Sequence, residues 1–435
     1  MNITVVGIGY MGLVLAVCLA EKGHNVTCID EDSDKIEQLK RGHSPFYEQK
    51  VAEKLVNNKN RLNFTTDYRI AYKEARVIII TTPITINEDG TVNADIIYDI
   101  VIQAAEEIER DCFVTIKSTV PIGTNDQAES IMREHLTQDI HVEFVSNPDF
   151  LRLGSAVDDL LNASHIIVGV ESEAAEAAMR EVYEGFQLPF VVINRRSAEL
   201  LKYAANGMLS VQISFMNELA DVCESVGASI EDIARGIDWD SRVSKQFMQS
   251  CLGYGEIPYI KESKSLSCYG ALDGVDMRTV RAAVETHEIK KWRLMNKGKK
   301  YYADYKGLTI AILGLASKPG TDDIDQSPAV SYIQSLLEKE VNDIKVWDPI
   351  AMNNLKQLYP DEVTYCSSIE KAISEADICF ILTEWPEIKY FDVYDFATYM
   401  KHPIVLDGQN CYSLCDMEEA GIVYESIGRR SIDGR

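Results

Sequence analysis

The chain has 435 residues, of which 46% are hydrophobic and 26% charged, and its formal net charge is −25. This composition is typical of a globular protein long enough for about three domains. The negative charge argues against a nucleic-acid partner, because phosphates require a basic surface. No apolar run approaches the roughly 20 residues that span a bilayer, so no membrane segment is predicted.

Ten cysteines are scattered along the chain without CxxC pairs or the spacing of metal ligands. This distribution favours free thiols in a reducing compartment and predicts no metal site. The N-terminus enters a strand pattern at once, which leaves no room for a signal peptide. The sequence therefore predicts a cytoplasmic protein.

The first thirty residues contain the clearest functional signal. Residues 3–6 form a β-branched apolar run, typical of a buried parallel strand, and lead into Gly-Ile-Gly-Tyr-Met-Gly at residues 7–12. A mostly apolar helical segment follows, and a second strand-like run ends at Asp30.

Each glycine of this motif has a physical role in dinucleotide binding. Gly7 permits the tight turn, Gly9 lets the backbone approach a pyrophosphate, and Gly12 lets helix and strand pack closely, with the helix N-terminus facing the phosphates. Asp30 can accept hydrogen bonds from a ribose diol and would repel a 2′-phosphate. The alternative is a glycine-rich turn that binds nothing. The complete strand–turn–helix context favours an NAD site, with NAD preferred over NADP.

Strands and helices alternate up to about residue 195, and polar clusters follow the strands. Such clusters begin at Thr82, Lys117 and Ser146, each directly after an apolar run. Open α/β sheets bind ligands at the carboxyl ends of their strands, although Ser-Thr-Pro clusters are also common turn formers and helix caps. Repetition at successive strand ends predicts a ligand site.

Residues 197–226 have a helical pattern far longer than an average helix. Glu199, Lys202, Asn206 and Glu218 fall near one face of it and could line a cleft together; the alternative is a solvated charge stripe. A long helix is also a natural surface for a symmetric homodimer. Its apolar positions include Leu200, Leu201, Leu209, Val211, Ile213 and Phe215.

A second βα rhythm begins near residue 306, without the glycine motif, and glycines at 253 and 255 suggest a loop that closes over a ligand. We therefore expect an α/β protein with two Rossmann-like, doubly wound parallel-sheet domains joined by a long central helix. The expected domains are an NAD-binding domain (1–195), a central helical dimerisation domain (196–300) and a C-terminal domain (301–435).

In order and over nearly the whole chain, these landmarks resemble the UDP-glucose/GDP-mannose dehydrogenase family, with its bacterial UDP-glucose 6-dehydrogenase branch the most similar. The resemblance rests on the glycine motif at 7–12, Ser-Thr-Val-Pro at 118–121, Asn-Pro-Asp-Phe-Leu-Arg at 147–152, Lys-Tyr-Ala-Ala-Asn at 202–206, Asn-Glu at 217–218, Gly-Tyr-Gly at 253–255, Lys-Pro at 318–319, Thr-Asp-Asp at 321–323, Ser-Pro at 327–328, Asp-Gly at 407–408 and Tyr-Glu-Ser-Ile-Gly-Arg at 424–429.

The resemblance implies NAD in the first domain, a UDP-sugar between the two Rossmann-like domains, and a homodimer through the long helix. Family members oxidise a sugar C6 alcohol to a carboxylate in two hydride transfers, through a cysteine thiohemiacetal and a thioester. It further implies that Lys202 and Asn206 stabilise the developing oxyanion. Asp149, where the family has a Glu, would manage protons and water, and Thr119 would order that water.

The resemblance also assigns the remaining site residues. Glu262 joins Lys202, Asn206, Asp149 and Thr119 as a catalytic residue. The residues expected at the cofactor are Gly7, Gly9, Tyr10, Met11, Gly12, Asp30, Lys35, Thr82, Pro83 and Thr119. Those expected to hold the UDP-sugar, the C-terminal domain contributing, are Phe150, Leu151, Lys202, Asn206, Arg242, Tyr254, Gly255 and Lys318.

The chain departs from the family at the nucleophile. The family motif Gly-Tyr-Gly-Gly-x-Cys-x-Pro-Lys-Asp-x-Lys aligns with residues 253–264 without a gap and puts Pro258 at the cysteine position. Proline has neither a nucleophile nor an N–H. The other departures replace a Gly by Glu256, an Asp by Glu262, a Glu by Leu153, an Arg that faces NAD by Asp325, and an Arg that reaches a neighbouring subunit's substrate by Gln409.

Three functions are compatible with this pattern. The first is NAD-dependent oxidation of a UDP-sugar that stops after two electrons. The second is a catalytically inactive nucleotide-sugar-binding protein, and the third is an enzyme that uses NAD transiently, in epimerisation or elimination. Retention of Lys202 and Asn206 favours catalysis, whereas Pro258 and Asp325 favour its loss.

Overall fold

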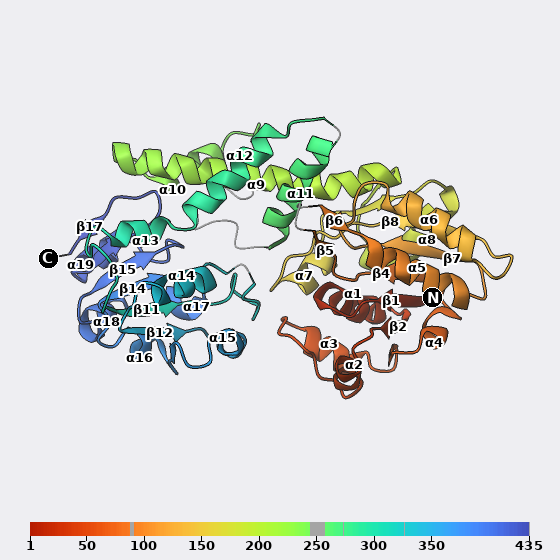
Figure 1. The fold of residues 1–435 in the computed structure, drawn as a ribbon, viewed down its shortest axis with the longest axis horizontal. Helices are drawn as coiled ribbons and strands as arrows, with labels where there is room; N and C mark the ends of the chain where they lie inside the picture. The colour runs from red at the N-terminus through yellow and green to blue at the C-terminus, as the bar shows by residue number, and fades with distance from the viewer. Residues whose placement is uncertain (88–90, 244–256, 273, 326, 435) are drawn as a thin grey trace. The chain divides into compact units, whose positions relative to one another are not determined.

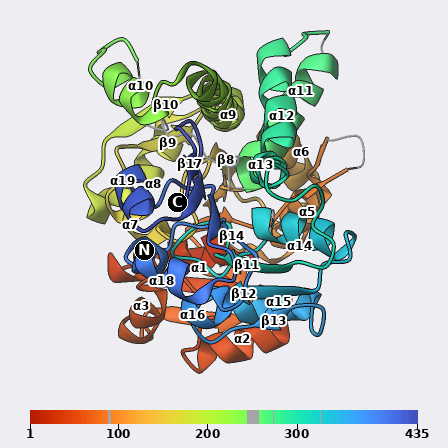
Figure 2. The ribbon, with the colours of Figure 1, turned by 90° about the vertical axis from the view of Figure 1, so that its left-hand side faces the viewer.

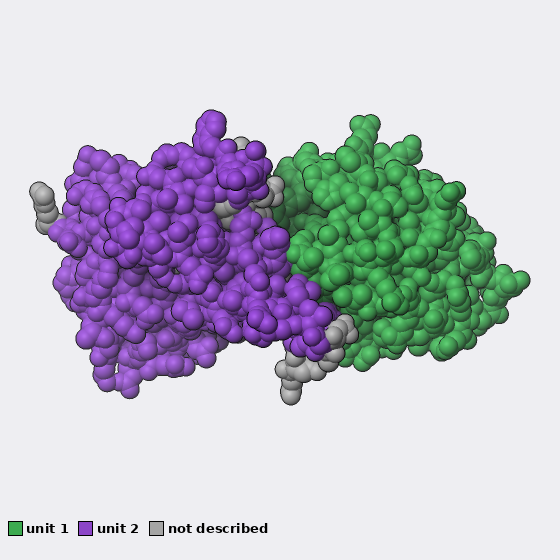
Figure 3. All heavy atoms as spheres, turned by 90° about the horizontal axis from the view of Figure 1, so that it is seen from above, with its two compact units in different colours: residues 1–205 green, residues 206–435 purple. Residues whose placement is uncertain are grey.

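The computed structural model describes residues 1–87, 91–243, 257–272, 274–325 and 327–434. They form two compact units, residues 1–205 and 206–435 (Figure 3), and the division falls inside the long helix α9 (Arg195–Val226). Each unit contains a mainly parallel β-sheet with helices on it (Figure 1). The predicted α/β class, with two Rossmann-like sheets and a long central helix, is confirmed.

The sheet of the first unit has the strand order β10-β9-β8-β7-β4-β1-β2-β3. Its strands from β3 to β8 are parallel, and the order reverses between β1 and β4, as in doubly wound dinucleotide-binding sheets. The strands are β1 (Asn2–Val6), β2 (Asn25–Ile29), β3 (Leu62–Thr65), β4 (Val77–Ile80), β7 (Cys112–Ile116), β8 (Val142–Ser146), β9 (Ile166–Gly169) and β10 (Phe190–Ile193).

Helices cover both faces of this sheet, because its central strands are apolar on both sides. The core on one face includes α1, which is buried from Gly12 to Ala20, and the core on the other includes α5 and α6. The helices are α1 (Tyr10–Glu21), α2 (Ser33–Lys40), α3 (Val51–Asn57), α4 (Tyr68–Tyr72), α5 (Asp95–Glu107), α6 (Thr124–His135), α7 (Ala156–Leu161), α8 (Glu173–Tyr183) and the 3₁₀ turn η1 (Glu184–Phe186); β5 (Thr85–Ile86) and β6 (Val92–Asn93) form a separate ribbon.

The sheet of the second unit has the order β13-β12-β11-β14-β15-β16-β17, which repeats the arrangement of the first. Figure 2 shows α14 and α15 on one side of its central strands and α16 and α18 on the other. Its strands are β11 (Thr309–Leu313), β12 (Asp343–Trp347), β13 (Thr364–Tyr365), β14 (Ile378–Ile381), β15 (Ile404–Asp407), β16 (Val423–Glu425) and the antiparallel β17 (Ile432–Asp433).

The helices of the second unit fall into two groups along the chain. Before the sheet come α10 (Ile230–Ile237), α11 (Ile257–Leu272), α12 (Arg278–Lys290) and α13 (Arg293–Gly298). Between its strands come α14 (Pro328–Leu337), α15 (Met352–Leu358), α16 (Ile369–Ile373), α17 (Pro386–Lys389), α18 (Val393–Tyr399) and α19 (Leu414–Glu419).

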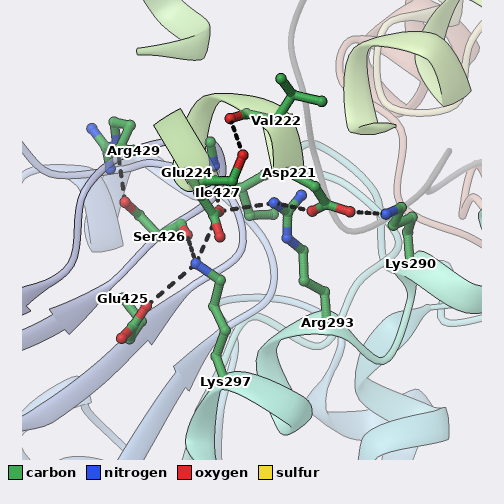
Figure 4. Close-up of polar contacts among 12 residues, drawn as sticks. Asp221, Val222, Glu224, Lys290, Arg293, Lys297, Glu425, Ser426, Ile427 and Arg429 are labelled. Carbon is green, nitrogen blue, oxygen red and sulfur yellow. Dashed lines mark hydrogen bonds and ion pairs between the residues drawn. The ribbon is translucent and has the colours of Figure 1, made fainter. Parts of the chain in front are cut away.

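A buried network of ion pairs fastens helices α9 and α13 to the second sheet (Figure 4). Lys297 Nζ lies 2.9 Å from Glu224 Oε1 and 3.3 Å from Glu425 Oε2, and it donates to Ser426 O at 2.7 Å. Arg293 Nη2 lies 2.8 Å from the same oxygen of Glu224. Because Glu224 belongs to α9 and Glu425 to β16, the C-terminal half of the long helix is part of the second unit.

Candidate functional site

The turn between β1 and α1 is closed at two glycines and open at the third. Gly7 has a φ of +87°, and a Cβ added there would lie 2.6 Å from Thr82 Cγ2. A Cβ on Gly12 would collide with Gly7 O, whereas no atom of the described residues lies within 4 Å of the Cβ position of Gly9. Side chains are therefore excluded where the turn packs on itself, and a ligand can approach the backbone at Gly9.

Helix α1 begins directly after this opening. Gly9 is its N-cap residue and has no side-chain oxygen that could cap the first turn. Within the described residues, no side-chain hydrogen bond caps this end of the helix. The N–H groups of the first turn therefore remain available to an external acceptor, and the helix dipole favours an anion there. The turn fits the pyrophosphate of a dinucleotide.

Asp30 lies beside the turn at the end of β2. Its Oδ2 accepts a hydrogen bond from Ile8 N at 2.7 Å, and Lys35 Nζ lies 3.0 Å from both carboxylate oxygens. The Asp30 side chain is still 13% exposed. Asp32 N also donates to its Oδ1 at 3.1 Å. These contacts match the roughly four lone-pair sites of a carboxylate, so a ribose diol would bind Asp30 by replacing the contacts from Lys35. The two predicted cofactor residues Asp30 and Lys35 are thus direct neighbours.

Tyr10 connects the glycine turn to a distant loop. Its hydroxyl donates to the buried Glu48 and accepts a hydrogen bond from Gly154 N at 2.6 Å. Burial raises the pKa of Glu48, although the hydrogen bond from Tyr10 opposes that shift. Met11, the next predicted cofactor residue, is partly buried. Tyr10 therefore fixes the end of the loop that contains Asp149 and Phe150.

The end of β4 packs directly on the glycine turn. Thr81 Oγ1 donates to Val6 O at 3.0 Å and to Gly7 O at 2.8 Å. Thr82 is buried against Gly7, and its Oγ1 has no hydrogen-bond partner among the described residues, while Pro83 is exposed. Thr119, which follows β7, is half-buried. These residues share the carboxyl edge of the first sheet.

Asp149 and Phe150 follow β8 at the same edge. Asp149 Oδ1 lies 3.4 Å from Nζ of the buried Lys117, the residue directly after β7. Phe150 is exposed and its ring centroid lies 5.2 Å from Lys202 Nζ, within cation–π distance. Leu151 is partly buried. The buried Lys202 on α9 is thus placed against the predicted substrate loop of the first unit.

In the second unit, Asn206 and Glu262 are in direct contact. Asn206 Nδ2 donates to Glu262 Oε2, and both side chains are buried. Glu262 belongs to α11, in which Pro258 is the second residue. Proline is tolerated in the first turn of a helix, where its missing N–H has no intrahelical partner to lose. Pro258 is therefore accommodated in the first turn of α11 without breaking the helix.

Two further residues that were predicted to hold the UDP-sugar, Arg242 and Lys318, belong to the second unit. Arg242 is exposed and pairs with Asp240, whose carboxylate accepts from its Nε at 2.9 and 3.1 Å. Lys318 is partly buried in the loop after β11. Tyr254 and Gly255, with Glu256, fall outside the described residues.

The expectation that Glu199 shares a cleft face with Lys202 is wrong. Glu199 accepts hydrogen bonds from Gly123 N at 2.6 Å and Asn125 N at 2.9 Å, and so caps the N-terminus of α6. Burial raises the pKa of Glu199, while these backbone N–H groups oppose the shift. Its carboxylate therefore accepts hydrogen bonds from N–H groups at the start of α6 and does not face a ligand.

The thiols of Cys18 and Cys112 are buried in the first unit. Burial raises the pKa of the Cys18 and Cys112 thiols to about 12, which makes these groups poor nucleophiles. Among the described residues, no cluster of three or more His, Cys, Asp or Glu is arranged to hold a metal ion. Nor does any described helix combine the length and apolarity needed to cross a membrane.

Sequence reasoning missed Thr81 and Glu48, and it placed Lys117 in a strand-end cluster without giving it an individual role. Thr81 and Lys117 directly follow strands, so their position at the carboxyl edge was a usable signal. Glu48 offered none, because its burial beside Tyr10 depends on a contact between segments 38 residues apart.

Three family profiles match consecutive parts of the chain. They describe the UDP-glucose/GDP-mannose dehydrogenase family: its NAD binding domain over residues 1–187, its central domain over 196–288 and its UDP binding domain over 311–414. The chain is 37% identical to UDP-glucose 6-dehydrogenase YwqF of Bacillus subtilis over 434 residues, which cover 99% of this chain and 98% of that protein.

Two further similarities extend this result. UDP-glucose 6-dehydrogenase TuaD of Bacillus subtilis is 35% identical over 440 residues, covering 100% of this chain and 94% of that one. The structure of a UDP-glucose dehydrogenase from Pyrobaculum islandicum superposes with a TM-score of 0.90 at 27% identity, covering 98% of this chain and 96% of that chain.

Proposed function

Since the chain belongs to the UDP-glucose/GDP-mannose dehydrogenase family, we propose that it is an NAD-dependent oxidoreductase that removes a hydride from C6 of a UDP-sugar, with UDP-glucose the first candidate. The predicted family and cofactor are confirmed by the matches reported above. The observation that supports an active cofactor site most directly is the turn that is closed at Gly7 and Gly12 and open at Gly9.

The residues present fit NAD. The first-turn N–H groups of α1 would hold its pyrophosphate, and Asp30 would accept from a ribose diol. Bound NAD would supply the hydride acceptor. We propose that Lys202 and Asn206 stabilise the negative charge that develops on the sugar oxygen. Because an amide has two N–H groups, Asn206 can serve this oxygen while it also donates to Glu262.

We propose further that the reaction stops after one hydride transfer. The first oxidation needs a cofactor, a positioned alcohol and a proton acceptor. The second normally depends on a thiol, because a free aldehyde has no hydride to give until a nucleophile adds to it. Pro258 provides no such nucleophile, and water is a poorer, unpositioned substitute. The expected product is therefore a UDP-sugar aldehyde.

The stoichiometry of NADH tests this proposal. Purified protein is incubated with NAD and a panel of UDP- and GDP-sugars, with hydroxylamine present to capture an aldehyde, and NADH absorbance and product mass are followed. One NADH and one captured aldehyde per UDP-glucose are expected. Two NADH and UDP-glucuronate at ordinary rates would contradict the two-electron limit.

Restoring the cysteine gives a matched comparison. Pro258→Cys is expected to gain a second NADH per sugar, whereas Pro258→Ala, which also restores the N–H but adds no thiol, is not. Binding of NADH and UDP-glucose without turnover in the wild-type protein would favour the inactive binding protein instead.

We also propose that the chain forms a symmetric homodimer through α9 and divides into functional parts at residues 1–195, 196–300 and 301–435. On α9, Met208, Phe215, Val222 and Val226 are all more than half exposed and repeat at helical spacing along one face. Burying this row against a second copy would remove it from water. Light scattering is expected to show a dimer, lost in Phe215→Asp but kept in Ser225→Asp, an exposed position outside the row.

A further inference from the structure

Lys117 and Asp149 are placed together by the pairing of two neighbouring strands. β7 and β8 are parallel, and Ile116 lies opposite Ser146, the last residue of each strand. Lys117 comes directly after β7 and Asp149 three residues after β8. Their side chains therefore leave the sheet at the same carboxyl edge, and Nζ and Oδ1 are 3.4 Å apart.

This pair is buried at the point where the sheet meets the predicted substrate loop. The side chains of Lys117 and Asp149 are 6% and 15% exposed. A buried ammonium ion without a counter-charge would cost several kcal/mol. Burial alone lowers the pKa of Lys117, but the neighbouring Tyr183 and Asp149 outweigh it, so the pKa is raised. Lys117 therefore remains a cation.

The loop that leads to Asp149 is held rigidly from its first residue. Tyr183 donates its hydroxyl hydrogen to Asn147 Oδ1 at 2.6 Å, and Asn147 Nδ2 donates to Ile167 O at 2.7 Å. At its other end, Tyr10 accepts from Gly154 N. Because both ends are anchored, Asp149 has little freedom to move away from the ammonium ion.

We propose that Lys117 is a positioning residue that holds Asp149 as a charged proton acceptor for the reaction proposed above, on which this inference rests. A fixed cation favours the ionised form of a neighbouring carboxyl group. A carboxylate can take up a proton from the sugar alcohol or from water, whereas the neutral acid cannot. Aspartate, one methylene shorter than the family's glutamate, keeps this carboxylate at the sheet edge, within reach of Lys117.

Four variants test the proposal with the full-length protein and UDP-glucose: Lys117→Met, Lys117→Arg, Asp149→Asn, and the double variant Lys117→Met/Asp149→Asn. Lys117→Met is expected to lower kcat by about tenfold to a hundredfold, which is at or below the lower end of the effect of one general acid–base group, because Lys117 acts through Asp149. KM for NAD should stay within about twofold, because the glycine turn is untouched, and Lys117→Arg should recover most of kcat.

The double variant shows whether Lys117 acts through Asp149 or has a role of its own. It also removes both charges of the pair, so neither is left buried without a partner. If Lys117 acts only through Asp149, the double variant has the same kcat as Asp149→Asn. A further loss in the double variant, as large as that of Lys117→Met alone, would overturn the proposal. So would an unchanged kcat in Lys117→Met.

If the wild-type protein turned over none of the sugars, both the proposed function and this inference would be contradicted. Wild-type turnover combined with an unaffected Lys117→Met variant would remove this inference alone.

Discussion

The two Rossmann-like sheets begin with the same framework and use it for different purposes. Gly7 and Gly314 follow the first strand of each sheet with φ of +87° and +86°, and each packs against a threonine, Thr82 or Thr383. An aspartate follows the second strand in both, and its Oδ2 accepts a 2.7 Å hydrogen bond from the N–H after the glycine. The framework itself therefore does not decide what binds.

The difference lies in the length of the following turn. In the first sheet, α1 begins right after Gly9, and Asp30 stays partly exposed. In the second, a long loop precedes α14 at Pro328, and Asp348 is fully buried. Its carboxylate accepts from the N–H groups of Leu315, Ala316, Ile350, Ala351 and the Trp385 indole. In the second sheet, residues after β11, β12 and β14 thus engage the acid, and Ser327 caps α14, whereas the short turn of the first sheet leaves the N-terminus of α1 to a ligand.

Exchanging the two aspartates for alanine gives the largest contrast. Asp348→Ala is expected to lower the free energy of unfolding by about 3–5 kcal/mol, because four buried donors and the partly buried Ile350 N–H lose their acceptor. Asp30→Ala, which leaves the buried Ile8 N–H without its acceptor, should lower it by only about 1–2 kcal/mol yet abolish tight NADH binding. Urea denaturation and calorimetric titration measure both. An equal decrease in the free energy of unfolding for Asp348→Ala and Asp30→Ala would contradict the difference between the two sheets.

The paired glycines should be equally strained and functionally different. Gly7→Ala and Gly314→Ala both force a side chain into the left-handed region and against a threonine, and each is expected to cost about 2 kcal/mol of stability. Only Gly7→Ala should also remove NADH binding. Fluorescence titration with NADH checks this, and retained binding in Gly7→Ala would show that the turn is not the cofactor site.

One buried histidine in each unit should make the protein less stable at acidic pH. Burial lowers the pKa of His287 in the second unit to about 4 from 6.5. Below pH 6.5 His287 binds a proton in the unfolded chain, but in the folded chain it stays neutral until the pH approaches 4. The contribution of neutral His287 to the free energy of unfolding is therefore lost as pH falls toward 4. Between pH 7 and 5, wild type should lose about 1–2 kcal/mol more than His287→Gln.

His24→Gln is the matched variant in the first unit. Burial and then the N-terminal ammonium ion lower the pKa of His24, so its replacement should act in the same direction. Urea denaturation at several pH values measures both, and parallel pH dependences for wild type and His287→Gln would contradict the expected role of His287.

The smallest expected effect concerns Lys35, which is bonded to Asp30 at 3.0 Å. Lys35→Ala removes a cation beside the ribose site and should increase the preference for NADH over NADPH by about threefold to tenfold. Stability should change by less than about 0.5 kcal/mol, because the pair is partly exposed. A gain in NADPH affinity would mean that Asp30 does not face the 2′ position.

Local patterns in the chain were sufficient for the sheets, the long helix and the glycine turn. A β-branched run, three glycines and an acid at the end of the next strand are fixed by covalent spacing, and few backbone conformations satisfy that spacing. The helix predicted over 197–226 is observed over Arg195–Val226 for the same reason, since its period is visible within the segment. The residues predicted to contact cofactor and sugar remain predictions.

Only the tertiary structure decided how the charged side chains are used. Glu199 caps α6, Tyr10 bonds to Gly154, which is 144 residues away, Lys117 faces Asp149, and Asp348 accepts from residues that follow three different strands. Burial and charge pairing are relations between segments that the chain brings together only on folding, so no window of sequence contains them. Two aspartates with the same local context, Asp30 and Asp348, consequently end in different environments, because Ala316, Ala351 and the Trp385 indole also donate to Asp348, whereas Lys35 and solvent meet Asp30.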